Sequence, residues 1–474
     1  MIRAFLLFFL ARVACLAQLS PVAEAWKNDK DLKSASISYC VVDAATASLV
    51  SEYNSHLALI PASTLKIVTT SAAMGLLGNG FRYETKLFYT GTFNKQSGVL
   101  NGDLVISGSG DPTLQSENFI RDSTVRVTDK WAQALKEKGI REITGSIIGD
   151  ASCFERTVPD NWIWGDIGNY FGAAPCGLSF MDNKFKLIYA TKEVGSKAEL
   201  ISIHPNYLKT PITVTSNIIA RGSDDEASIY GDPFSYHREA SGRIPAHKTA
   251  FPLEATLPDP ALLCAEMLYT SLIKAGIVCS KQSIVSNYKK TDTLQGKQWL
   301  YTHFSPSLDK IILFTNLKSN NLYCESLLRT MGKGNLAAGI DAVRNYWQKK
   351  GLDISELFMA DGCGLSRANT LTTSLQVLLL SKIYKDSVNY KAFNLSLPVA
   401  GKSGSMSTIG KGKPIENNLR AKTGYINRVR GYCGYVRSQS GRDLAFSVLF
   451  NNYTCSAQEA KLKLEKFMVE LGNL

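Results

Sequence analysis

The sequence predicts an α/β protein with more than one domain, in which an antiparallel sheet flanked by helices is interrupted by a mostly β insertion. Its 474 residues exceed one typical domain core. Residues 18–85 and 290–474 combine the two-residue alternation of strands with the helical periodicity of apolar residues. Residues 86–289 carry short strand patterns separated by turn sequences rich in Gly, Asp and Pro. The two flanking segments are therefore expected to meet in space and form one discontinuous domain.

The N-terminal flank begins with a predicted strand pair, Ile37 to Val42 and Ser48 to Ser51. A helix is predicted to open at Ser63, because Pro61 stands just before it and an apolar run continues to Leu77. The run is apolar almost all round, so this helix is expected to be buried.

The C-terminal flank ends in a predicted hairpin and a predicted helix. Tyr432 to Val436 and Ala445 to Phe450 are apolar segments separated by a turn sequence at Ser438 to Gly441. In Ala457 to Leu471 the apolar residues fall on one helical face. This helix is expected to cover one side of the sheet.

Three short motifs follow one another in this framework: S-x-x-K at Ser63–Lys66, S-x-N at Ser319–Asn321 and K-T-G at Lys422–Gly424. Together and in this order they form a serine-acylation signature. Each motif alone is weak, and S-x-x-K recurs at Ser271 and Ser286. Only the first copy stands at the start of a predicted buried helix, which selects it.

The first two motifs supply a nucleophile and its proton acceptors. Ser63 and Lys66 are three residues apart on a helix, so they share one face and the amine can take the hydroxyl proton. Burial favours the neutral form of an amine, which suits Lys66 to act as the base. Ser319 is expected to relay a proton toward the leaving amine, and Asn321 to hold a substrate amide.

The third motif is expected to recognise the substrate. Lys422 with Thr423 would bind a carboxylate, and Gly424 would let a substrate backbone approach the strand closely. The backbone N–H groups of Ser63 and Tyr425 are expected to form the oxyanion hole, where fixed donors stabilise the developing charge.

The chain resembles the low-molecular-mass penicillin-binding proteins that act as D-alanyl-D-alanine carboxypeptidases, in the S13 class with a large insertion between the first two motifs. Further segments are similar to that family: residues 102–114, 149–154, 162–178, 361–367 and 397–401. The resemblance runs nearly end to end and implies a serine β-lactamase/transpeptidase-like domain. Cys363 stands where the family often has serine, and residues 401–406 depart from its usual Gly-x-x-Gly-Thr-Leu.

The resemblance implies a serine D-Ala-D-Ala carboxypeptidase that is inhibited by penicillin and acts on peptidoglycan stem peptides through an acyl-enzyme on Ser63. Endopeptidase activity stays open. The resemblance also places Asp150 in a side pocket for the cationic end of a diaminopimelate-type stem peptide, and Arg367 near the site. From the residues alone, Asp150 could instead cap a turn and Arg367 could pair with Asp361.

Two alternative functions stay open. A serine β-lactamase would use the same acylation residues, but β-lactamases are usually compact and the long insertion argues against one. A non-catalytic peptidoglycan-binding or sensor protein would keep the pocket without turnover. The intact set of Ser63, Lys66, Ser319 and Lys422 makes that alternative weaker.

Charge and composition limit the partners. The formal net charge of +12 suits anionic envelope polymers. No basic run with interleaved aromatics and no nucleic-acid motif is found, so nucleic-acid binding is not expected. The histidines are scattered and no C-x-x-C pair occurs, so neither a metal site nor a cofactor is expected.

Residues 1–17 are predicted to be a signal peptide, with a positive start at Arg3, an apolar core and small residues before Gln18. This segment is too short to span a bilayer, and Arg12 disfavours lipidation at Cys15. The mature protein is therefore expected to be exported, periplasmic or otherwise extracytoplasmic, without an integral membrane segment. Loose membrane association stays open.

Ten cysteines leave nine after removal of such a leader. An odd number implies at least one unpaired thiol in a monomer, and the sequence does not assign any disulfide. Cys324 and Cys433 lie in apolar patterns and are expected to be small buried hydrophobic residues.

Overall fold

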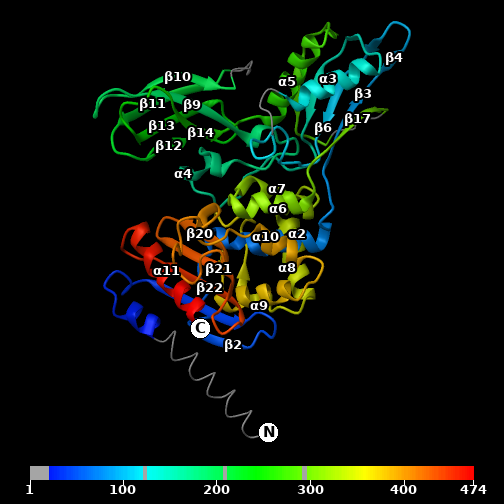
Figure 1. Cartoon of the computed structure of the whole chain (residues 1–474). Coiled ribbons are helices and arrows are strands. Elements are labelled where there is room, and N and C mark those ends of the chain that lie inside the picture. Colours follow the sequence, from blue (N-terminus) through cyan, green and yellow to red (C-terminus); the bar gives the residue numbers. More distant parts are fainter. Residues whose placement is uncertain (1–20, 121–124, 206–210, 291–295) are drawn as a thin grey trace. The chain divides into compact units, whose positions relative to one another are not determined.

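The computed structural model describes residues 21–120, 125–205, 211–290 and 296–474, so the predicted signal peptide lies outside the described residues. The chain forms two compact units (Figure 1). The first comprises the chain up to Phe81, Leu308–Asn320 and Ala337–Leu474, and the second comprises Arg82–Ser307 and Asn321–Leu336. The expected insertion ran from 86 to 289. The segment 321–336, which was expected in the catalytic domain, belongs to the second unit.

The first unit is built on an antiparallel sheet with strand order β2-β1-β22-β21-β20. Its strands are β1 (Ser36–Asp43), β2 (Leu49–Tyr53), β20 (Arg420–Ile426), β21 (Val429–Arg437) and β22 (Asp443–Asn451). These bounds confirm the predicted strand pair and the predicted hairpin. Because β22 lies between β1 and β21, the two flanking segments of the chain meet in the middle of the sheet.

Helices cover both faces of this sheet. Successive strand residues point to opposite faces. The hydroxyl of Ser38 in β1 hydrogen-bonds Thr373 of α9, whereas the next residue, Tyr39, packs its ring on Phe467 of α11 with centroids 4.9 Å apart. The helices α9 (Thr373–Tyr384) and α11 (Ala457–Asn473) therefore lie on opposite faces. The predicted C-terminal helix is confirmed.

Further elements of the first unit are η1 (Ala62–Leu65), α2 (Lys66–Leu77), α6 (Leu308–Leu317), α8 (Leu336–Lys349), η5 (Ile354–Glu356), β18 (Leu357–Phe358), β19 (Thr370–Leu371), α10 (Tyr390–Ser396) and η6 (Gly404–Met406). The α-helix expected to open at Ser63 instead begins at Lys66, after the 3₁₀ turn η1. Almost the whole of α2 is buried, as its apolar composition predicts.

The second unit is mostly β, as expected, and its described residues form four sheets. The five-stranded sheet consists of β16 (Ile284–Asn287), β8 (Ile147–Asp150), β6 (Leu104–Ser107), β3 (Glu84–Tyr89) and β17 (Gln298–Phe304). The four-stranded sheet consists of β15 (Val278–Cys279), β7 (Glu142–Ile143), β5 (Val99–Asn101) and β4 (Thr92–Asn94). The two three-stranded sheets consist of β10 (Glu199–His204), β9 (Lys184–Ala190) and β14 (Phe251–Thr256), and of β11 (Thr213–Ala220), β13 (His237–Ile244) and β12 (Ser228–Tyr230).

The second unit also contains the helices α3 (Val127–Glu137), α4 (Trp164–Ile167), η2 (Tyr170–Gly172), η3 (Met181–Asn183), α5 (Pro260–Lys274) and α7 (Asn321–Met331). Of these, α3, α4, η2 and α5 contact its strands. Trp131 of α3, Leu268 of α5 and Ile106 of β6 are fully buried in one core cluster. Ser271 lies late in α5 and Ser286 lies in β16, so neither stands at the start of a helix.

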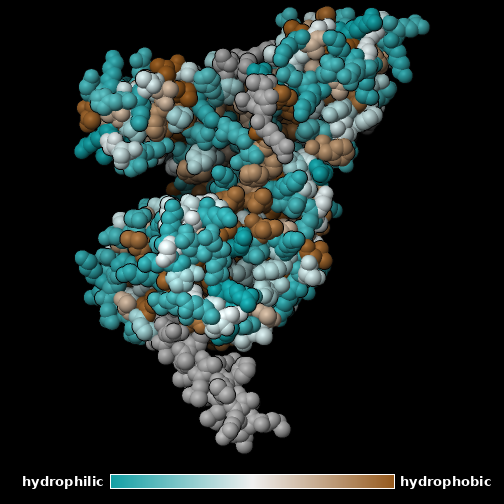
Figure 2. All heavy atoms as spheres, in the orientation of Figure 1, coloured by the Kyte–Doolittle hydropathy of each residue, from teal (hydrophilic) through white to brown (hydrophobic). Residues whose placement is uncertain are grey.

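Hydrophilic side chains cover most of the face drawn in Figure 2, and hydrophobic ones lie in small groups. Among the described residues, no helix is both long and apolar enough to cross a membrane. Cys324 and Cys433 are fully buried, as expected for small hydrophobic residues.

Candidate active site

Ser63 and Lys66 are in contact at the junction of η1 and α2. The Nζ atom of Lys66 lies 3.0 Å from the Oγ of Ser63 and donates to the carbonyl oxygen of Cys363 at 2.8 Å. The Lys66 side chain is fully buried. The carbonyl therefore fixes the amine at hydrogen-bond distance from the serine hydroxyl, which is the geometry that a general base requires.

The backbone just before Ser63 is strained. Ala62 has φ of 47°, in the left-handed region that costs a non-glycine residue energy. Both backbone groups of Ile60 hydrogen-bond the side-chain amide of Asn451, at 2.9 and 3.1 Å. This clamp from the sheet helps to hold the turn in a conformation that the sequence alone does not favour.

A loop after β18 supplies the Cys363 carbonyl. The Asp361 carboxylate accepts from the backbone N–H groups of Gly364 and Ser366, at 2.7 and 2.6 Å. A Cβ atom at Gly364, whose φ is 82°, would lie 1.9 Å from the carbonyl oxygen of Ala62, so only glycine allows this approach. Arg367 belongs to the same loop and is half-buried.

A second lysine–serine contact lies at the edge of the sheet. The Nζ of Lys422 in β20 lies 2.9 Å from the Oγ of Ser319 and 2.8 Å from the carbonyl oxygen of Thr423. Lys422 is fully buried, and Ser319 has a left-handed φ of 56°. The second and third motifs are thus in direct contact.

The strand β20 also packs against the turn that carries Ser63. A Cβ atom at Gly424 would lie 2.5 Å from the carbonyl oxygen of Pro61 and 3.1 Å from the backbone nitrogen of Thr64. Because β20 is the last strand in the order of its sheet, its outer side is open to η1. In this way the first unit brings together Ser63, Lys66, Ser319, Lys422 and Gly424.

Two side chains beside the third motif were not identified from the sequence. Ser405 lies 2.8 Å from the Oγ1 of Thr423, hydroxyl to hydroxyl. The guanidinium of Arg430 lies 5.3 Å from the ring centroid of Tyr425, whose side chain is 53% exposed. Residues 401–406 differ from the Gly-x-x-Gly-Thr-Leu sequence that the family often has, and this difference drew attention to the segment that contains Ser405. No comparable signal pointed to Arg430.

Cys433 of β21 lies opposite Lys422 in the strand register. Burial raises the pKa of the Cys433 thiol. The thiol therefore stays neutral near physiological pH and gives Lys422 no anionic partner on this side.

Two predicted site residues belong to the second unit. Asn321 is the first residue of α7, and its Nδ2 donates to the carbonyl oxygen of Phe171 at 2.7 Å. Asp150 ends β8 and is buried, and its Oδ1 accepts from the backbone N–H of Ser152 and from Asn287, both at 3.1 Å. These are the contacts of a turn-capping residue, and a binding role for Asp150 stays a prediction.

The chain was compared with known proteins. Residues 19–472 match the model of the D-Ala-D-Ala carboxypeptidase 3 (S13) family. The D-alanyl-D-alanine carboxypeptidase DacB of Haemophilus influenzae is 26% identical over 432 residues, which cover 88% of this chain and 85% of that protein. The D-alanyl-D-alanine carboxypeptidase of Actinomadura sp. is 26% identical over 461 residues, which cover 93% of this chain and 82% of that protein.

Solved structures of related proteins have a similar fold. The crystal structure of penicillin binding protein 4 (dacB) from Haemophilus influenzae is similar with a TM-score of 0.78 and 25% identity, covering 96% of this chain and 99% of that chain. A predatory endopeptidase from Bdellovibrio bacteriovorus, solved with an immunity protein, shares the fold with a TM-score of 0.50 and 18% identity, covering 93% of this chain and 94% of that chain. Because the family model matches nearly the whole of this chain, the chain belongs to the D-Ala-D-Ala carboxypeptidase 3 (S13) family.

Proposed function

We propose that this protein is a penicillin-sensitive serine D-Ala-D-Ala carboxypeptidase that acts on peptidoglycan stem peptides. The observation that carries the proposal is the pair of lysine–serine contacts, Lys66 with Ser63 and Lys422 with Ser319, in which both lysines are fully buried. Family membership and the names of the relatives support the choice of substrate.

In the proposed acylation step, Lys66 takes the proton of the Ser63 hydroxyl while the Oγ attacks the carbonyl carbon of the penultimate D-alanine. The C–N bond to the terminal D-alanine then breaks, and the leaving amine receives a proton through Ser319. Water hydrolyses the ester, which releases the shortened peptide and restores the Ser63 hydroxyl.

Substrate recognition is proposed for the third motif. Lys422 and the adjacent hydroxyls of Thr423 and Ser405 are suited to bind the carboxylate of the terminal D-alanine. The N–H groups of Ser63 and Tyr425 would bind the oxyanion. A β-lactam also carries an amide carbonyl beside a carboxylate, so the same groups would acylate with penicillin.

Finer points of specificity are also proposals. Asn321 would hold a substrate amide, Asp150 would bind the cationic end of a diaminopimelate-type stem peptide, and Arg367 would lie near the site. Endopeptidase activity on D-alanyl cross-links would use the same acyl-enzyme, because only the leaving amine differs. The substrate lies outside the cytoplasmic membrane, so we also propose export, which N-terminal sequencing of the mature protein from the cell envelope tests.

Labelling with a tagged penicillin, followed by peptide mapping, tests the nucleophile. We expect the label on Ser63, no label on Ser63→Ala, and labelling slowed by orders of magnitude in Lys66→Ala. Ser271→Ala is the matched control, since Ser271 heads another S-x-x-K sequence, and it should label normally.

Three outcomes would contradict the proposal. A label on Ser271 or Ser286 would move the nucleophile. Rapid release of hydrolysed penicillin with turnover would indicate a β-lactamase. Stable labelling without release of D-alanine from a D-Ala-D-Ala peptide would indicate a sensor.

A further inference from the structure

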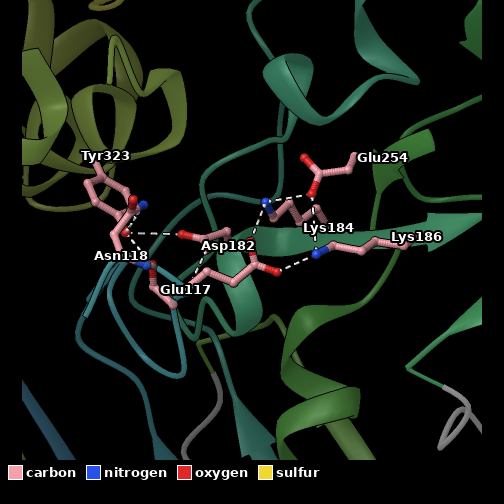
Figure 3. Close-up of polar contacts among 8 residues, drawn as sticks. Glu117, Asn118, Asp182, Lys184, Lys186, Glu254 and Tyr323 are labelled. Carbon is pink, nitrogen blue, oxygen red and sulfur yellow. Dashed lines mark hydrogen bonds and ion pairs between the residues drawn. The ribbon is translucent and has the colours of Figure 1, made fainter. Parts of the chain in front are cut away.

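The asparagine of the S-x-N motif, Asn321, stands on α7, and Tyr323 of the same helix takes part in a polar cluster of the second unit (Figure 3). Asn321 is the first residue of α7, and Tyr323 follows it in the same helical turn. The Tyr323 side chain is fully buried, and its ring stacks on Phe119 with centroids 6.2 Å apart. A shift of this turn would move Asn321 with it.

The hydroxyl of Tyr323 is held from several directions. It donates to the Oδ1 of Asp182 at 3.0 Å and accepts from the Nδ2 of Asn118 at 3.2 Å. The Ser116 hydroxyl is also within hydrogen-bond distance of the same oxygen. A phenol with this many partners has a fixed position, which is the property required of an anchor.

Burial of the Asp182 carboxyl costs free energy unless its oxygens are hydrogen-bonded. Asp182 is only 7% exposed, and its second oxygen accepts from the backbone N–H of Glu117 at 3.2 Å. Burial raises the pKa of this carboxyl, an effect that the nearby charge of Lys184 and the hydrogen bonds partly offset. Lys184 in turn pairs with Glu254 at 2.9 Å, as Figure 3 shows.

The turn that presents Asp182 is strained. Met181, Asp182 and Asn183 are consecutive residues with φ of 53°, 54° and 50°. Asp and Asn enter this left-handed region more readily than other non-glycine residues, so the steric cost falls mainly on Met181. The Asn183 side chain holds the turn, because it accepts from the N–H of Phe180 at 3.0 Å and donates to the carbonyl oxygen of Ala174 at 2.9 Å. Strain that the surroundings enforce in this way is typical of functional positions.

We propose that Asp182 and Tyr323 are positioning residues for Asn321 in the acylation reaction. The inference rests on the proposed function, which gives Asn321 its role through the S-x-N motif. The insertion then does more than extend the molecule, because its residues hold the helix that carries Asn321, the asparagine of the S-x-N motif. A simpler alternative is that the cluster only stabilises the second unit.

A double-mutant cycle separates these alternatives. The variants are Tyr323→Phe, Asp182→Asn, Asn321→Ala and the double variant Tyr323→Phe/Asn321→Ala, and the measured quantity is the second-order rate constant of acylation by a tagged penicillin. Each single variant is expected to lose about tenfold, and the double variant is expected to be no slower than Asn321→Ala. Urea unfolding of each variant reports stability separately.

The substitutions are chosen to be small. Tyr323→Phe removes one oxygen atom and keeps the ring contact with Phe119, so it carries the test if Asp182→Asn does not fold. In Asp182→Asn, only one side-chain oxygen remains for two donors. Lys186→Gln is the matched control, because Lys186 joins the rim of the same cluster through Glu117 at 2.6 Å and should acylate at the wild-type rate.

The inference is overturned if Tyr323→Phe acylates at the wild-type rate, or if the losses of Tyr323→Phe and Asn321→Ala multiply in the double variant. Multiplied losses would mean that Tyr323 acts independently of Asn321. Failure of the proposed function looks different, since the wild-type protein itself would then take no label on Ser63.

Discussion

Each of the two buried lysines of the candidate site contacts one serine hydroxyl and one backbone carbonyl. For Lys66 the carbonyl belongs to Cys363, and for Lys422 it belongs to Thr423. A buried amine without acceptors would be costly, so these carbonyls both satisfy the lysines and fix their rotamers. For Lys66 the catalytic geometry therefore depends on the backbone of Cys363, which lies outside the three motifs.

At the scale of single residues, Asp111 predicts a pH dependence of stability. Its Oδ1 accepts from the backbone N–H and the hydroxyl of Thr113, but its Oδ2 is buried and has no hydrogen-bond partner within the described ranges. Burial raises the pKa of Asp111 from 3.8 to about 6. The folded protein thus binds a proton that the unfolded chain releases, so stability falls as pH rises from about 4 to 6.

Asp111→Asn should remove this dependence, so that its stability relative to the wild-type protein rises by about 2 to 3 kcal/mol between pH 4 and pH 7. Urea unfolding between pH 4 and pH 7 measures it. The exposed carboxyl of Asp160 offers a matched control, since Asp160→Asn should leave the pH profile of the wild-type protein in place. An unchanged pH dependence in Asp111→Asn would show that another group carries it.

At the scale of elements, the contact between β20 and η1 determines the position of the third motif relative to Ser63. Gly424 makes this contact possible, and Gly424→Ala would place a methyl group 2.5 Å from the carbonyl oxygen of Pro61. Backbone atoms cannot move aside cheaply, so β20 must shift away from the turn. Penicillin acylation should fall by about tenfold or more while unfolding changes by about 1 to 3 kcal/mol.

Gly80→Ala is the control for this prediction. Gly80 lies in the same unit, and a Cβ atom there would meet nothing within 4 Å. The rate constant of acylation and the urea midpoint are measured for both variants. Wild-type acylation by Gly424→Ala would mean that the strand can adjust without disturbing Ser63 and Lys422.

Local sequence predicted these elements well but not the turn that carries the nucleophile. The strands near Ile37 and Tyr432 follow from alternation, a property of neighbouring residues. The left-handed φ of Ala62 depends on Asn451 and Gly364, which are distant in sequence. The helix expected to open at Ser63 therefore begins three residues later. The unusual sequence at residues 401–406 did not reveal that Ser405 contacts Thr423, and Arg430 is brought beside Tyr425 by the pairing of β20 with β21.

At the scale of the whole molecule, the sequence predicted that the N-terminal and C-terminal segments meet in one domain. It did not predict where the chain passes from the first unit to the second. The pairing of β1 with β22 follows from strand signals at both ends. The helix α7 belongs to the second unit, and its Tyr323 contacts Ser116 and Asp182 of that unit, which are more than a hundred positions away in the sequence. Helical periodicity near Asn321 carries no information about such partners.

The nine cysteines from Cys40 to Cys455 give a prediction for the whole chain. All nine are free thiols, and burial raises the pKa of Cys40 and of Cys176 to about 12. Since thiolates are the reactive form, iodoacetamide near pH 8 should modify the native protein slowly, beginning at the partly exposed Cys455, because burial raises the pKa of Cys153 to about 12 as well.

In urea without reductant, intact-mass analysis of a protein lacking residues 1–17 should show all nine thiols alkylated. Prior treatment with dithiothreitol serves as the control and should leave the count unchanged. A lower count that dithiothreitol restores to nine would show a disulfide and contradict the free thiols of the structure. Rapid alkylation of Cys40 or Cys176 in the native protein would instead show that the surrounding core opens, because a thiol with a pKa of about 12 is almost wholly protonated at pH 8.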